Sequence, residues 1–175
     1  MGCAACPIVS CGPFTFGPIC GMRNTLADVL KRLWEYNSTP RSTQGEAMIH
    51  VLEDLYKVQL PDDFKTYLIE ASPAVASDDK NNFVFWAPEK IASVKDIWGD
   101  DFPEKLNHIN TNDCLLFADY LDWCGYAYAI CCSQGPDRGK VALIGTDNIQ
   151  DHWIANSFYS FISMVVENSD RLHSA

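Results

Sequence analysis

The amino-acid sequence predicts a single-domain α+β protein, with a mixed or antiparallel sheet flanked by N-terminal helices and a C-terminal helix. The chain has 175 residues, a length that suits one well-buried core. Its apolar residues recur at helical spacing up to about residue 71 and at the two-residue spacing of strands from residue 83. The predicted helices do not alternate with the strands, which favours an antiparallel or mixed sheet over a doubly wound parallel one.

Three helices are expected first, at residues 25–36, 46–56 and 61–71. In each of them apolar residues form one helical face. Thr43 and Glu46 have the spacing of a capping box, which predicts the start of the second helix. The third begins with a proline and two acids, a combination typical of helix starts because proline has no N–H to lose there. The expected buried face of the second helix comprises Met48, Val51, Leu52, Leu55 and Tyr56.

Four strands are expected after the change of period, at residues 83–86, 114–118, 126–132 and 140–144. The third of these has apolar or small side chains on both faces, so we expect it at the centre of the sheet, covered by helices. Residues 134–139 have the composition of a hairpin connection. A final helix is expected at residues 157–168. A helical segment is also expected after Pro88, carrying Ile91, Val94, Ile97 and Trp98.

Residues 1–22 are interpreted as a separate cysteine-rich arm, and residues 23–175 as the domain. The arm has no helical or strand period and is interrupted by glycines and prolines, so we expect it to be irregular and dispensable for the core. Met22 is an alternative start of the chain. Four thiolates would suit tetrahedral zinc, but their spacing contains a single short pair, so no metal and no cofactor is expected. The candidate ligands would be Cys3, Cys6, Cys11 and Cys20.

The net charge of the chain is −10, and most of it lies in the middle of the sequence. Residues 61–122 carry thirteen acids against five bases. Such a surface repels nucleic acid and anionic membranes and attracts basic proteins, with a purely solubilising role as the alternative. The sequence has no apolar run of about 18 residues and no secretory signal, which indicates a cytoplasmic protein. The acids expected in loops at the ends of the sheet, and hence the candidate partner-binding residues, are Asp96, Asp100, Asp101, Glu104, Asp119 and Asp122.

No catalytic residue and no enzyme activity is expected from this sequence, because it lacks common catalytic motifs. Gly-rich phosphate loops, nucleophile elbows and His-Glu-x-x-His motifs are absent. His108 and Cys114 are the nearest histidine–cysteine pair, and we interpret them as a loop histidine beside a buried thiol. A small thiol- or zinc-dependent enzyme is the alternative.

Five segments, taken in order, resemble the SUKH superfamily across about residues 43–170. They are Leu60-Pro61-Asp62-Asp63-Phe64, the aromatic strand ending in Trp86 with Pro88 behind it, Leu115-Leu116-Phe117-Ala118-Asp119, Gly125-Tyr126-Ala127-Tyr128, and the final helix from Ser157-Phe158 to Phe161-Ile162.

The resemblance implies a helix-flanked α+β fold and a binding role without catalytic residues. Members most often act as immunity proteins that neutralise a co-encoded bacterial toxin, frequently a nuclease or deaminase. We therefore expect a basic toxin domain as the partner, blocked by occlusion of its working surface. Fungal relatives act instead as regulatory scaffolds, which makes binding to a cellular protein the alternative. The oligomeric state stays open.

Overall fold

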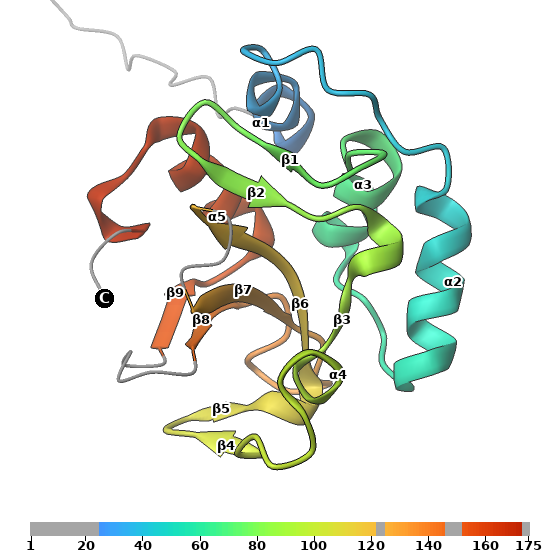
Figure 1. The fold of residues 1–175 in the computed structure, drawn as a ribbon, viewed down its shortest axis with the longest axis vertical. Helices are drawn as coiled ribbons and strands as arrows, with labels where there is room; N and C mark the ends of the chain where they lie inside the picture. The colour runs from blue at the N-terminus through green and yellow to red at the C-terminus, as the bar shows by residue number, and fades with distance from the viewer. Residues whose placement is uncertain (1–24, 122–124, 146–151, 173–175) are drawn as a thin grey trace, which may run out of the picture.

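The computed structural model of this chain describes residues 25–121, 125–145 and 152–172. The predicted arm at residues 1–22, with its four cysteines, lies outside these ranges. Within them, helices and an antiparallel sheet form one body, and helices from both ends of the chain flank the sheet (Figure 1). The predicted α+β class is confirmed.

Four helices pack against one face of the sheet, and a shorter fifth helix covers the other face. The first helix begins with a reciprocal cap. Oγ1 of Thr25 accepts a bond of 3.2 Å from the Asp28 N–H, and the Asp28 carboxylate accepts one of 2.9 Å from the Thr25 N–H. This capping box fixes the start of the helix where the sequence predicts it. The helices are α1 (Leu26–Leu33), α2 (Gly45–Tyr56), α3 (Asp62–Glu70), α4 (Val94–Trp98) and α5 (Phe158–Glu167).

The main sheet has the strand order β1-β2-β6-β7-β8-β9, with β3 also paired to β6, and all of these pairs are antiparallel. Strand β7 lies between β6 and β8, so the predicted central strand is confirmed. The strands are β1 (Ser77–Asp78), β2 (Phe83–Phe85), β3 (Ala92–Ser93), β4 (Lys105–Leu106), β5 (Ile109–Asn110), β6 (Cys114–Tyr120), β7 (Tyr126–Cys131), β8 (Val141–Gly145) and β9 (His152–Ala155).

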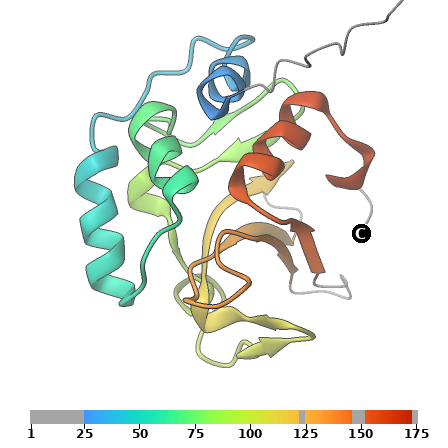
Figure 2. The ribbon, with the colours of Figure 1, turned by 180° about the vertical axis from the view of Figure 1, so that it is seen from behind.

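The main hydrophobic core lies between the sheet and helices α1, α2, α3 and α5, of which α3 and α5 stand in front of the sheet in Figure 2. The ring of Phe64 in α3 lies 5.5 Å from that of Phe117 in β6 and 5.0 Å from that of Phe158 in α5. The N-termini of the two helices are also joined by a polar contact, because Asp63 accepts a bond of 2.9 Å from the Tyr159 N–H. Aromatic packing and this bond hold both helices to the sheet.

A second, smaller core lies on the opposite face of the sheet. There α4, the 3-10 turn η2 (Thr111–Asp113) and the β4–β5 hairpin cover the small and apolar side chains of the central strands. In Figure 1 these elements lie at the lower end of the molecule, away from α1. The buried members are Trp86, Val94, Ile109, Cys114, Leu116, Ala127, Ala129, Cys131, Ala142 and Ile144.

The prediction of one helical segment after Pro88 is wrong. The chain forms a 3-10 turn η1 (Pro88–Lys90), then the extended strand β3, and only then the five-residue helix α4. The cause is the sheet, because Ala92 and Ser93 pair with Leu116 and Leu115 of β6 and satisfy their backbone groups there.

The predicted face of α2 is confirmed for Leu52, and Met48 and Tyr56 pack partly against the core, but it is wrong for Val51 and Leu55. Val51 and Leu55 are 49% and 64% exposed, and no side chain caps the helix where Thr43 was expected to do so. The cause is a close approach of two helices, because a Cβ atom on Gly45 would lie only 1.9 Å from the Leu68 carbonyl oxygen of α3. This contact turns Gly45 and Ile49 inward beside Leu52, in place of Val51 and Leu55.

Candidate protein-binding surface

The short helix α4 is defined at both ends by its own sequence. Ser93 is the N-cap, and its Oγ accepts a bond of 3.1 Å from the Asp96 N–H. Gly99 ends the helix with φ at +93°, a conformation that side chains other than glycine rarely adopt. Val94 is buried in the second core, so the helix is anchored to the sheet while its other face meets solvent.

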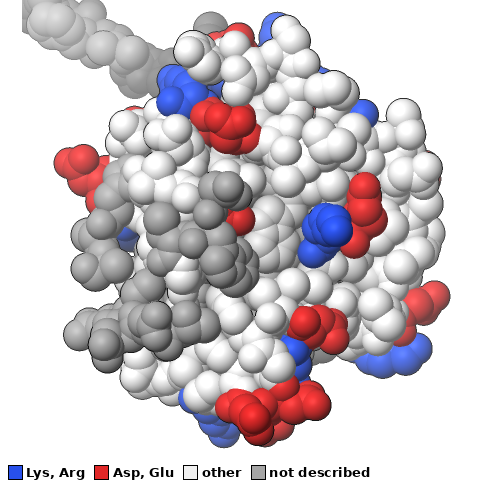
Figure 3. Space-filling model, in the orientation of Figure 1, with Lys and Arg blue, Asp and Glu red and all other residues white. Residues whose placement is uncertain are grey.

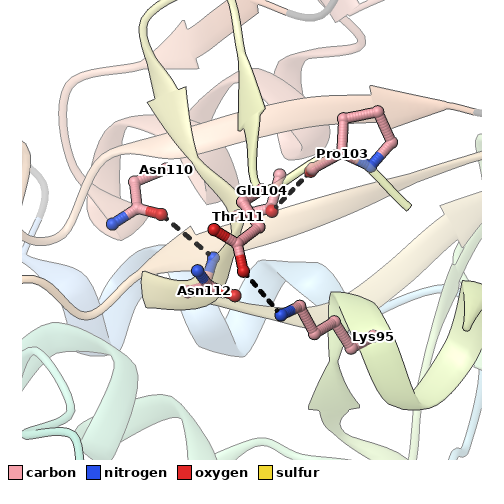
Figure 4. A network of polar contacts seen from close by, with 6 residues as sticks. All are labelled: Lys95, Pro103, Glu104, Asn110, Thr111 and Asn112. Carbon is pink, nitrogen blue, oxygen red and sulfur yellow. Dashed lines mark hydrogen bonds and ion pairs between the residues drawn. The ribbon is translucent and has the colours of Figure 1, made fainter. Parts of the chain in front are cut away.

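A polar network holds the loop after α4 against η2 (Figure 4). Thr111 makes two hydrogen bonds in this network. Its N–H donates to the Glu104 carbonyl at 2.9 Å, and its Oγ1 hydroxyl donates to the Pro103 carbonyl at 2.8 Å. The Asn112 N–H donates to the Asn110 side chain at 3.3 Å. The residues between Gly99 and Glu104 are therefore fixed at both ends.

The predicted acids Asp96, Asp100, Asp101 and Glu104 are all exposed and lie together over α4 and the start of the β4–β5 hairpin. We call these four residues the α4 acidic surface. Acidic side chains gather at the lower end of the molecule in Figure 3, where these elements lie in Figure 1.

Two of the four carboxylates already have partners. Asp96 accepts bonds of 2.8 Å from the hydroxyls of Tyr56 and Ser93, and these bonds hold its pKa below the ordinary value. Glu104 pairs with the Lys95 ammonium at 2.9 Å, and this bond lowers the pKa of Glu104 as well. The bonds of these two carboxylates hold parts of the surface together, and the positive charge of Lys95 offsets the negative charge of Glu104.

Asp100 and Asp101 differ from these two. Within the described part of the chain, neither side chain makes a hydrogen bond or an ion pair. They stand in the loop directly after Gly99, so their charges are offset least and are available to an approaching cation.

Apolar side chains flank these two acids, and the sequence analysis did not identify them as a surface feature. The rings of Trp98 and Phe102 stack with their centroids 4.9 Å apart, and both side chains are half-buried. Ile97 is 38% exposed. The α4 acidic surface thus combines carboxylates with partly exposed apolar groups, a composition common in protein interfaces.

Asp119 does not belong to this surface, and its prediction as a loop acid is wrong. It lies inside β6 between Val84 of β2 and Ala127 of β7, and it is only 4% exposed. Its carboxylate accepts a bond of 2.7 Å from the Trp86 indole N–H. Strand β6 continues two residues beyond the predicted end, so Asp119 lies within the strand, on the face of the sheet that bears the second core. Asp122 lies outside the described residues.

The residues that the structure describes contain neither a candidate metal site nor a membrane-spanning helix. They contain no group of three or more His, Cys, Asp or Glu side chains that could hold a metal ion. None of their helices has the length and apolar character needed to cross a membrane. Cys3, Cys6, Cys11 and Cys20 lie outside the described ranges.

The family model described as "SMI1 / KNR4 family (SUKH-1)" matches residues 45–164, which include α2, the α4 acidic surface and most of the sheet. A comparison with curated protein sequences finds no match.

Proposed function

Because this chain belongs to the SMI1 / KNR4 family (SUKH-1), we propose that it works by binding another protein and not by catalysis. The family is consistent with an immunity-type or a regulatory protein. The expected partner is a basic bacterial toxin domain, for example a nuclease or a deaminase. Binding neutralises the toxin by covering its active or substrate-binding surface, a mechanism that needs complementary shape and charge and no chemistry.

The observation that carries this proposal is the pair Asp100 and Asp101, exposed and unpaired within the described residues, beside the partly exposed Ile97. Toxins that act on nucleic acid carry basic surfaces, because phosphate binding requires them. Two carboxylates on a loop fixed to a rigid sheet can pair with such a surface at small entropic cost. The apolar side chains next to them supply the desolvated contacts that slow dissociation.

Affinity purification from the native cell tests the proposal, with the full chain as bait. We expect a basic protein to co-elute, and we expect its toxic activity to disappear when the purified chain is added in stoichiometric amount. The variant Asp100→Lys/Asp101→Lys should lose the partner.

A matched control reverses two exposed acids at the other end of the molecule, Glu35→Lys/Glu70→Lys, and should keep it. Equal capture by both variants would contradict the proposed surface. A specific partner with no toxic activity would favour the regulatory alternative, in which the chain binds a cellular protein.

A further inference from the structure

Two cysteines face each other across the central strands of the sheet. Cys114 is the first residue of β6 and Cys131 is the last of β7, and the strand register pairs them directly. Both side chains lie on the same face of the sheet, in the second core, and both are buried as thiols. The pair comes from segments seventeen positions apart, so the sheet and not the sequence brings the two sulfurs together.

The backbone geometry of this pair suits a disulfide bond. The Cys131 N–H donates to the Lys140 carbonyl at 2.9 Å, and the Cys131 carbonyl accepts from the Gly139 N–H at 2.8 Å, so both groups point away from β6. Cys114 and Cys131 therefore form a non-hydrogen-bonded pair, in which Cα atoms lie about 4.5 Å apart. Disulfides span Cα separations of about 4.4–6.8 Å, so closing the bond requires little movement of either strand.

The two thiols also differ in acidity. The Cys114 thiol donates a hydrogen bond to the Asn110 carbonyl at 3.4 Å. Its contact with the Cys131 sulfur, together with contacts from Ser133, lowers the pKa of Cys131 to about 6 against the effect of burial. The same contact and burial raise the pKa of Cys114 well above its ordinary value. Oγ of Ser133 lies 3.3 Å from the Cys131 sulfur. Cys131 is thus the more acidic of the two thiols, with Cys114 as its neighbour.

We propose that Cys131 and Cys114 form an oxidisable pair, which a peroxide converts to a disulfide between β6 and β7. The Cys131 thiolate attacks one peroxide oxygen, the O–O bond breaks, and the other oxygen leaves as water after taking up a proton. Cys131 becomes a sulfenic acid. The Cys114 sulfur then attacks the Cys131 sulfur and expels the hydroxyl, which leaves as water with the Cys114 proton. In total, two thiols lose two electrons and two protons, and one peroxide becomes two waters.

The choice of oxidant follows from burial. Cys131 is 3% exposed and Cys114 is fully buried, so a large oxidant such as glutathione disulfide cannot reach either sulfur in the folded chain. Hydrogen peroxide is little larger than water. The Cys131 sulfur lies close to the surface, 3.3 Å from Oγ of the half-buried Ser133, and Gln134 beyond it is exposed.

Cys132 provides an internal control. It follows Cys131 in the sequence but points to the opposite face of the sheet, into the main core, and burial raises its pKa. It therefore lacks both the partner and the acidity of Cys131. This inference does not rest on the proposed function.

Peptide mapping of the full-length chain after treatment with hydrogen peroxide tests the inference. Cleavage before aspartates separates Cys114, in residues 113–118, from Cys131, in residues 122–136. We expect the two peptides to be joined, with a combined mass lower by two hydrogen atoms. Fragmentation should assign the link to Cys131, and a reductant should release it. Glutathione disulfide should give no link while the chain is folded.

Variants check the order of the steps. In Cys114→Ser, the sulfenic acid of Cys131 should persist and react with dimedone once the treated chain is unfolded, whereas Cys131→Ser should give neither the link nor the adduct. Cys132→Ser should form the link to the same extent as the wild type. The unmodified chain alone decides the matter if a variant does not fold. A link from Cys114 to another cysteine, or no link at peroxide doses that oxidise exposed thiols, would overturn the inference.

Discussion

Replacing Asp119 with alanine tests whether this carboxylate belongs to the interior of the fold or to its surface. The structure buries Asp119 in β6 and places its oxygen 2.7 Å from the Trp86 indole nitrogen. Alanine removes this acceptor and leaves the buried indole N–H without it. If Asp119 instead stood in a surface loop, as the sequence alone predicts, the substitution would change little.

The expected loss follows from the character of the bond. The net worth of a hydrogen bond is about 0.5–1.5 kcal/mol, and taking the acceptor from a buried donor costs about 1–3 kcal/mol. We expect Asp119→Ala to lower the free energy of unfolding by about 2 kcal/mol. For a chain of this length, that corresponds to a fall of about 4–8 °C in Tm. Asp119→Asn keeps an acceptor of the same size and should lose less.

Denaturant unfolding of four chains measures the interaction itself: wild type, Asp119→Ala, Trp86→Phe and the double variant. The double-mutant cycle should give a coupling of about 1–2 kcal/mol, because each single variant removes the same bond. Asp100→Ala, at an exposed acid, is the control and should change stability by no more than about 0.5 kcal/mol. A loss of about 0.5 kcal/mol or less for Asp119→Ala, or a coupling near zero, would refute the burial of this bond.

Three further outcomes are expected. Gly45→Ala should cost about 3 kcal/mol or more in denaturant unfolding, because its Cβ would meet the Leu68 carbonyl oxygen; a cost below about 1 kcal/mol would contradict the close approach of α2 and α3. Burial raises the pKa of Glu53, but the 2.7 Å pair with Lys65 and a backbone bond outweigh this effect and lower the pKa below its ordinary value. The stabilisation of the fold by Glu53 should therefore be present above about pH 5 and lost as the pH falls through the folded pKa. Glu53→Gln should be about 1 kcal/mol less stable at neutral pH and should show a smaller loss between about pH 5 and 3; an unchanged acid profile would contradict this role. A chain shortened to begin at Met22 should melt within about 5 °C of the full chain by calorimetry, and a larger fall would make residues 1–22 structural.

The sequence predicted those elements whose apolar periodicity matches the faces that are buried in the structure. Strand β7 alternates between residues facing the two cores, so its central place could be inferred from side chains alone. The short strands β1, β3, β4, β5 and β9 were missed. Segments of two to four residues carry too little pattern to separate a strand from a loop, and their pairing partners decide them.

In the candidate site, too, the contacts that depend on distant segments could not be predicted from the sequence. Four of the six predicted acids lie together on the α4 acidic surface, because consecutive residues around a short helix stay close in any fold. Asp119 could not be placed, because an acid after an apolar strand usually marks its end, and here its indole partner comes from a distant segment. The hydrogen bond from Tyr56 to Asp96 could not be foreseen either, since the two residues lie forty positions apart.

The rate at which the co-purified partner associates with this chain tests the proposed binding surface most directly. Surface plasmon resonance at about 0.1 M and 1 M salt compares the wild type with Asp100→Lys/Asp101→Lys and with Glu35→Lys/Glu70→Lys. Long-range attraction is screened as the Debye length shortens from about 10 Å to about 3 Å. We expect the wild type and the Glu35/Glu70 variant to associate about tenfold faster than the Asp100/Asp101 variant at low salt, with the difference vanishing at high salt. Equal association rates for all three chains at low salt would contradict binding through the α4 acidic surface.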